Sequence, residues 1–233
     1  MREYTALLKR ALLLALIVAL PACSDRTEQA KEVLKSQLAE KKYLDFQNLE
    51  NFPGGVVCGE YRANDPVRGS GKFRRFVVWG ETAEARPSQA DWDIFCSRDP
   101  AAALFSVFGI GPPGDAEAQL PKILEDLKTL QAALALYLED NFTLPSTEQG
   151  LGALVAASTI PPKPLKFRQG GYLAAVPMDP WGRPYQYERD RLSGGVAQEF
   201  RLFTLGADGA AGGTGKDADV GTGQLKYLDH IDP

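Results

Sequence analysis

Residues 177–185 read Pro-Met-Asp-Pro-Trp-Gly-Arg-Pro-Tyr, and this stretch sets the architecture of the second half of the chain. The segment Asp179-Pro180-Trp181-Gly182 inside it has the composition of a tight turn, because proline fixes φ at about −65° and glycine accepts a positive φ. Trp181 offers a large apolar surface that can cover a sheet. We therefore expect a structural turn at these residues, and not an active site.

Two β segments are expected after this turn. Tyr185 and Tyr187 lie in the first, and residues 200–203, Phe-Arg-Leu-Phe, form the second. Aromatic and aliphatic residues favour strands, and Ser193-Gly194-Gly195 between the two segments favours a reversal of the chain. The sequence therefore predicts a β-hairpin.

The segment before the turn predicts a long amphipathic helix from Leu120 to about Asn141. Pro121 suits the first turn of a helix, where no backbone N–H is needed. Apolar residues recur at steps of three and four, which places them on one helix face. They are Ile123, Leu127, Leu130, Leu134, Tyr137 and Leu138. We expect this face to pack into a core, and a coiled-coil seam for a partner is the alternative.

Residues 206–221 form a glycine-rich loop that carries three carboxylates, those of Asp208, Asp217 and Asp219. Such a loop can bury little apolar area, so another interaction must order it. Ca²⁺ fits this composition, because it takes carboxylate and main-chain oxygens and glycine lets the backbone turn its carbonyls inward. A flexible acidic loop without an ion is the alternative. A phosphate-binding loop is excluded, since Asp217 stands where the motif needs Ser or Thr.

Four separated motifs follow one another in a specific order. They are residues 140–151 (DNFTLPSTEQGL), 171–173 (GYL), 177–185 (PMDPWGRPY) and 203–209 (FTLGADG). In this order they resemble the globular domain of the major pseudopilin of type II secretion, the protein G family, over residues 120–221. The resemblance implies an α+β fold in which a long helix packs on a short antiparallel sheet, with a short second helix in the connecting loop.

The same resemblance implies a calcium site in the glycine-rich loop. The side chains of Asp208 and Asp219 match the ligand positions best, Asp217 is a further ligand, and the main-chain carbonyl of Leu205 completes the expected set. Calcium is the only cofactor that we expect.

Residues 1–22 have the pattern of a bacterial export signal. Basic residues precede an uninterrupted apolar run over 11–20, which as a helix spans only about 15 Å, about half of the hydrocarbon core of a bilayer. Leu20-Pro21-Ala22-Cys23 resembles a lipobox, so we expect Cys23 to be acylated and to anchor the chain in the envelope, facing the periplasm. Ser24 favours the outer membrane over the inner one. An ordinary secretory signal with a chance cysteine is the alternative.

Residues 23–98 predict a small α+β module that looks like one found in bacterial lipoproteins. We expect an amphipathic helix over 26–42 and β runs at 56–61, 73–79 and 92–96. With Cys23 acylated, Cys58 and Cys96 remain in an oxidising compartment, where an even pair favours a disulfide. We expect this disulfide to join the two outer strands of the module, and a reactive or metal-binding cysteine is the alternative.

The composition divides the chain and excludes several functions. Residues 99–119 are rich in proline and glycine and predict a linker between the 23–98 module and a pseudopilin-like domain over 120–233. A formal net charge of −4 argues against nucleic-acid binding. The single histidine, His230, is expected in the C-terminal tail, and no Ser/His/acid set is present. We therefore expect neither an enzyme nor a small-molecule substrate.

Together these features predict a lipid-anchored, calcium-stabilised periplasmic protein that is a structural or accessory component of a type II secretion or pilus-like system. Its expected partners are secretion-system or other envelope proteins and the membrane. Pseudopilins begin with a short basic leader before a Phe-starting apolar helix, whereas here a lipoprotein signal and a module precede the head, so we expect no polymerisation of the usual kind. The alternative is a free-standing envelope lipoprotein that uses the head as a binding module.

Overall fold

A computed structural model of the chain describes residues 26–38, 43–65, 69–111, 119–189 and 200–231. The expected signal peptide, the acylated Cys23 and the turn at 193–195 lie outside these residues. In the described part of the chain, no helix combines the length and the hydropathy that crossing a bilayer requires.

The first sheet is antiparallel, and its four main strands follow the order β1 (Leu44–Asn51), β2 (Val57–Asp65), β4 (Arg74–Trp79) and β5 (Thr82–Glu84). The two-residue β3 (Gly69–Ser70) pairs with β2, and the 3₁₀ turn η1 (Pro53–Gly55) connects β1 to β2. Helix α1 (Arg26–Gln37) packs Ala30 and Leu34 on one face of this sheet. The helix expected over 26–42 is thus confirmed as far as Gln37.

The β run that we expected at 92–96 is wrong. These residues belong to helix α2 (Gln89–Phe95), which ends at Cys96. Ser88 caps the helix: its hydroxyl oxygen accepts a 3.1 Å hydrogen bond from the backbone N–H of Asp91, and the Asp91 carboxylate accepts a 3.0 Å bond from the backbone N–H of Ser88. This reciprocal capping box begins a helix at a sequence whose aromatic residues favour a strand.

Cys58 and Cys96 form the expected disulfide, but it does not join two outer strands. Cys58 lies on β2, which pairs with β1 on one side and with β4 on the other, and Cys96 lies at the C-terminal end of α2. The disulfide therefore ties α2 to the interior of the sheet.

The segment expected as a linker contains packed structure. Helix α3 (Pro100–Phe108) begins at Asp99, whose carboxylate accepts a 2.9 Å hydrogen bond from the backbone N–H of Ala102. Leu104 in this helix and Ile110 after it are 1% exposed. Residues 112–118 of the expected linker lie outside the described part of the chain.

The second half has the α+β architecture that the resemblance implied. Helix α4 (Leu120–Asn141) buries the predicted face, and the short second helix is the 3₁₀ helix η3 (Leu151–Leu154). The strands of the second sheet are β6 (Gln186–Arg189), β7 (Phe200–Thr204) and β8 (Val220–Gly221), in that order and all antiparallel. The pairing of β6 with β7 confirms the predicted hairpin.

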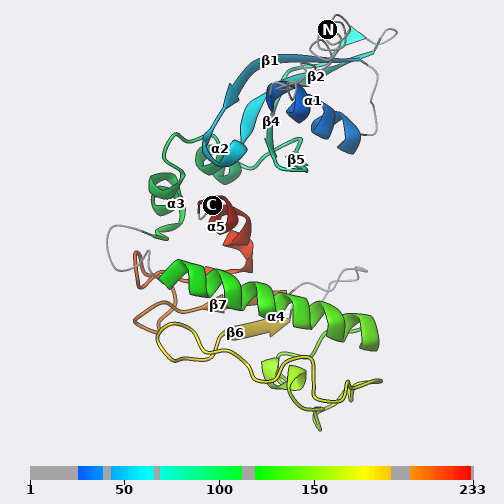
Figure 1. The fold of residues 1–233 in the computed structure, drawn as a ribbon, viewed down its shortest axis with the longest axis vertical. Helices are drawn as coiled ribbons and strands as arrows, with labels where there is room; N and C mark the ends of the chain where they lie inside the picture. The colour runs from blue at the N-terminus through cyan, green and yellow to red at the C-terminus, as the bar shows by residue number, and fades with distance from the viewer. Residues whose placement is uncertain (1–25, 39–42, 66–68, 112–118, 190–199, 232–233) are drawn as a thin grey trace, which may run out of the picture.

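The two halves share one hydrophobic core. After β8 the chain passes through η4 (Thr222–Gln224) into helix α5 (Leu225–Ile231), which lies between the first sheet and α4 (Figure 1). The core runs from the first sheet through α2 and α5 to α4, and includes Val56, Cys58, Val77, Ile94, Phe95, Leu127, Leu130, Tyr227 and Leu228. His230, which we expected in the C-terminal tail, lies in helix α5 and is 9% exposed.

Candidate functional site

The turn at 179–182 is a buried hydrogen-bonded anchor for the second sheet. One carboxylate oxygen of Asp179 accepts hydrogen bonds from the backbone N–H groups of Trp181 (3.0 Å) and Arg183 (2.8 Å). The other oxygen accepts a 2.6 Å bond from the hydroxyl of Thr204 on β7. Gly182 has a φ of 79°, the conformation for which a glycine was expected. Every role observed for Asp179 is therefore structural.

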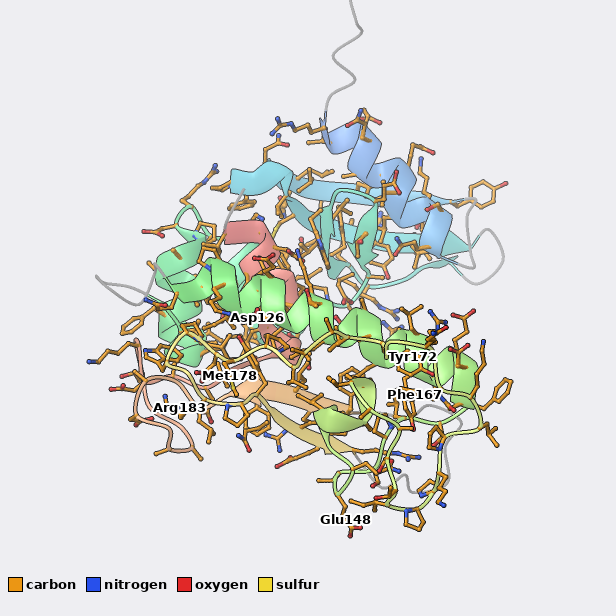
Figure 2. The ribbon with its side chains drawn as sticks, turned by 60° about the horizontal axis from the view of Figure 1, so that its bottom comes forward. Asp126, Glu148, Phe167, Tyr172, Met178 and Arg183 are labelled. Carbon is orange, nitrogen blue, oxygen red and sulfur yellow. A yellow bond between two sulfur atoms is a disulfide. The ribbon has the colours of Figure 1, made fainter. Side chains whose placement is uncertain are left out.

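Arg183 connects this turn to the glycine-rich loop. Its guanidinium donates to the main-chain carbonyl of Gly206, and it lies 6.0 Å from the centre of the Trp181 ring. Met178 lies beside the N-terminal half of α4, where its main-chain carbonyl accepts a 3.0 Å hydrogen bond from Lys122 (Figure 2). Asp126 accepts a 2.8 Å hydrogen bond from the hydroxyl of Tyr185, which fixes the start of the hairpin to the helix.

The glycine-rich loop folds back on itself through its main chain. A 2.8 Å hydrogen bond joins the N–H of Ala207 to the carbonyl of Lys216. A Cβ atom at Gly206 would lie 2.4 Å from the carbonyl carbon of Asp217, and one at Gly213 would lie 2.3 Å from the Asp217 carbonyl oxygen. These glycines are needed because the two sides of the loop approach each other too closely for any side chain.

The three acidic side chains of the loop are separated in this arrangement. Asp208 is exposed and accepts a 2.9 Å hydrogen bond from the N–H of Ala210. One oxygen of Asp219 accepts a 2.9 Å bond from the N–H of Gly212, and Asp217 is half-buried. Among the described residues, no group of three His, Cys, Asp or Glu side chains is placed to hold a metal ion.

The Asp219 carboxylate nevertheless has an oxygen atom that a cation could bind. Its second carboxylate oxygen is buried and has no hydrogen-bond partner within the described part of the chain. An unpaired buried carboxylate oxygen costs free energy, and a bound cation offsets this cost. Because glycine lets a loop backbone turn its carbonyls toward an ion, Asp219 in this glycine-rich loop fits a Ca²⁺ site. Leu205, Asp208 and Asp217 stay predicted ligands.

A second polar cluster, which the sequence did not reveal, fixes the loop after α4. The Asp140 carboxylate accepts hydrogen bonds from Arg168 (2.5 Å) and Lys166 (2.8 Å), and these two cations hold the pKa of Asp140 well below its usual value. The Nδ2 group of Asn141 donates to the Tyr172 hydroxyl at 3.1 Å. Tyr172 and Phe167 lie beside the C-terminal half of α4, whereas Glu148 points away from the core (Figure 2).

The third polar cluster joins α5 to α2. The Asp91 carboxylate accepts a 2.6 Å hydrogen bond from the Tyr227 hydroxyl and lies 2.5 Å from the Lys226 ammonium. Burial alone would raise the pKa of Asp91, but the bonds from Lys226, Tyr227 and Ser88 together outweigh it and lower that pKa. The centre of the Phe95 ring lies 5.3 Å from the ring centre of Tyr227 and 5.2 Å from that of His230.

A long helix on a short antiparallel sheet, followed by a glycine-rich loop after the second strand, defines the head of a pseudopilin-type protein. Comparison with known proteins agrees: residues 112–223 match the family model of type II secretion system protein G. The core protein G of Pseudomonas aeruginosa is 50% identical over 96 residues, which are 41% of this chain and 65% of that protein. The core protein G of Vibrio cholerae serotype O1 is 44% identical over 110 residues, 47% of this chain and 72% of that protein.

The crystal structure of the major pseudopilin from the type 2 secretion system of enterohaemorrhagic Escherichia coli is 38% identical, with a TM-score of 0.39. The alignment covers 46% of this chain and 87% of that one. The chain belongs to the type II secretion system protein G family. The family match begins after α3 and ends before α5, so the first sheet, α1 to α3 and α5 lie outside it.

Proposed function

We propose that the chain is a structural or accessory component of a type II secretion system, held in the envelope by lipid at Cys23 and stabilised by calcium in the 206–221 loop. The observation that carries the proposal is the protein G head over residues 112–223, fused to a folded module that the family model does not cover. The curated relatives are named core proteins of this secretion system.

A structural role, and not catalysis, agrees with how the buried polar side chains are used. Asp91, Asp140 and Asp179 each accept hydrogen bonds that join separate elements of the fold. Their carboxylates are thus engaged in holding α5, the loop after α4 and β7 in place. Turnover of a substrate that depends on one of these carboxylates would contradict this part of the proposal.

Calcium binding is supported by Asp219. One oxygen of its carboxylate is buried with no partner among the residues that the structure describes, and it lies in a glycine-rich loop, which together suit a hard cation. When bound, the ion would neutralise this carboxylate and hold the two sides of the loop together. The proposed ligands are Asp208, Asp217, Asp219 and the main-chain carbonyl of Leu205.

Lipid anchoring is supported by the sequence around Cys23 and is tested directly. Mass spectrometry of the N-terminal peptide is expected to show an acylated Cys23 as the first residue. Cys23→Ser should leave the membrane fraction, because stable anchoring needs the acyl chains. Density separation of the membranes tests the expected outer-membrane location. An unmodified Cys23, or an unchanged membrane fraction for the variant, would contradict the anchor.

Site-specific photo-crosslinking in the native host tests the secretion role. A photoreactive residue at Met178, which is 53% exposed on the head, is introduced into the full chain. We expect crosslinks to secretion-system proteins that disappear when the secretion genes are deleted. The same residue at the exposed Gln47 in the first sheet serves as a matched control. Crosslinks that persist after the deletion would favour a free-standing envelope lipoprotein.

A further inference from the structure

The first sheet carries a groove at the end where its hydrophobic core stops. The core under α1 includes Tyr61 on β2 and Phe76 on β4, and both strands continue beyond these residues to Ala63 and Arg74. Tyr61 is paired with Arg74 in the strand register. The exposed end of this face borders a hollow of about 700 Å³. Its lining includes the apolar Leu38, Leu44, Ala63 and Ala85 and the basic Lys72, Arg74 and Arg86.

The floor of this groove is apolar and continuous with the core. Leu38, Leu44 and Ala85 are partly buried and pack against the core cluster that holds Tyr61. An apolar portion of a ligand placed here would extend the core and remove these side chains from water, which is favourable.

The rim of the groove is strongly basic. Arg62 already has partners within the protein: its guanidinium donates to Asp45 at 2.8 and 2.9 Å and lies 4.6 Å from the centre of the Phe73 ring. Lys72, Arg74 and Arg86 have no acidic partner among the residues that the structure describes. The one acidic lining residue, Glu84, lies 4.0 Å from Lys226 of α5. The groove therefore offers three cations to an occupant.

The apolar floor and the basic rim together indicate which class of ligand the groove fits. Arginine and lysine attract phosphate and carboxylate groups, and the arginine fork can bind either group through two hydrogen bonds. A free anion would make no use of the apolar floor, and a neutral lipid would leave the cations unused. The volume lies within the range of about 300–1,000 Å³ that is usual for small-molecule sites.

We propose that this groove binds an anionic amphiphile, with its phosphate or carboxylate at Lys72, Arg74 and Arg86 and its acyl portion over Leu38, Leu44 and Ala85. The charge of the rim and the apolar floor complement the two parts of such a molecule. The site depends neither on calcium in the distant loop nor on the anchor at Cys23, so its failure and that of the proposed function are distinguishable.

Calorimetric titration of the whole chain from Ser24 onward, exported so that its disulfide forms, tests the proposal. The probe is dihexanoyl-phosphatidylglycerol below its critical micelle concentration. Dihexanoyl-phosphatidylcholine, inorganic phosphate and a short acidic peptide are the comparisons. We expect binding of the anionic lipid at least tenfold tighter than any of the other three, and weaker in high salt. Equal affinity for the two lipids, or tighter binding of phosphate or of the peptide, would overturn the proposal.

Single substitutions in the groove test whether the anionic lipid binds there. Arg74→Glu should weaken binding of the anionic lipid at least tenfold. Arg75→Glu is the matched control, because it makes the same charge change one residue further along β4, where Arg75 lies 4.5 Å from the Trp92 ring centre outside the groove. Ala63→Phe keeps every charge and fills the floor, and it should also abolish binding. Equal effects of Arg74→Glu and Arg75→Glu, or full binding by Ala63→Phe with unchanged thermal stability, would refute the assignment.

Discussion

The hydroxyl of Tyr227 donates a 2.6 Å hydrogen bond to the carboxylate of Asp91, a residue 136 positions earlier in the chain. Tyr227 lies in α5, after the end of the protein G match, and Asp91 lies in α2, before its start. Two segments that are additional to the family domain are therefore joined to each other. Since α5 also contacts α4 through the Lys128–Asp229 ion pair, this helix fastens the N-terminal module to the head.

Removing the Tyr227 hydroxyl should weaken this connection without disturbing the ring. Tyr227→Phe keeps the contacts with Phe95 and Phe108 but removes a hydrogen bond to a buried carboxylate. We expect a loss of about 1–3 kcal/mol in the free energy of unfolding, measured in urea. Tyr43→Phe, at a position 59% exposed, is the control and should change little. Equal stabilities of the two variants would show that the hydroxyl contributes nothing.

His230 should make the stability of the chain depend on pH. Its ring packs on Phe95, its Nε2 atom is buried without a hydrogen-bond partner among the described residues, and burial lowers its pKa. The unfolded chain therefore binds the proton more readily, so stability is complete above about pH 6.5 and falls as the pH drops toward the folded-state pKa. His230→Gln should flatten this part of the stability profile. A parallel decline in both proteins between pH 7 and 5, measured by urea unfolding, would assign the effect to other groups.

The disulfide between Cys58 and Cys96 should be a main source of stability for the N-terminal module. The residues are 38 positions apart, and closing a loop of this length stabilises by roughly 3–4 kcal/mol in the chain-entropy model. We expect dithiothreitol to lower the urea midpoint of the natural chain and to leave the Cys58→Ala/Cys96→Ala variant unchanged. An identical midpoint with and without reductant would contradict this contribution.

The sequence predicted an element well where neighbouring residues carry a clear pattern, and poorly where that pattern is interrupted or outweighed. Helix α4 was predicted to its last residue because its apolar residues keep the helical period over 22 residues. Strand β1 was missed because a bulge between Gln47 and Glu50, with Asn48 at a φ of 53°, breaks the alternation that identifies a strand. Helix α2 had a readable signal, Ser88 followed by Asp91 at the capping-box spacing, which the aromatic residues after it outweighed.

The polar clusters could not be predicted, because they depend on distant parts of the chain. Asp91 and Tyr227 meet only once both halves have folded, and α5, with seven residues, is too short to form by propensity alone. Asp140 and Arg168, which also meet only in the folded chain, are 28 positions apart in the sequence. In the glycine-rich loop, composition predicted a calcium site, which stays a prediction, and the fold determines that the Asp219 carboxylate has a buried oxygen without a partner among the described residues.

Calcium should stabilise the chain through Asp219. An ion present at about 100 times its dissociation constant adds about 2.7 kcal/mol to the free energy of unfolding, which for a chain of this size raises the melting temperature by about 5–10 °C. We expect this shift between excess Ca²⁺ and chelator in the natural chain, and its loss in Asp219→Ala, because that variant removes the buried oxygen. Asp208→Ala and Asp217→Ala should reduce the shift.

Glu148→Ala, which removes an exposed carboxylate that points away from the core, is the matched control and should keep the full shift (Figure 2). Mg²⁺ should stabilise less, since it prefers a rigid octahedral site and retains its water. In chelator, Asp219→Ala should melt close to the natural chain, because the variant removes a buried oxygen that has no partner among the described residues but also the bond that Asp219 accepts from Gly212. A calcium shift that survives in Asp219→Ala would place the ion elsewhere, and identical melting with Ca²⁺ and with chelator would refute a calcium site in this loop.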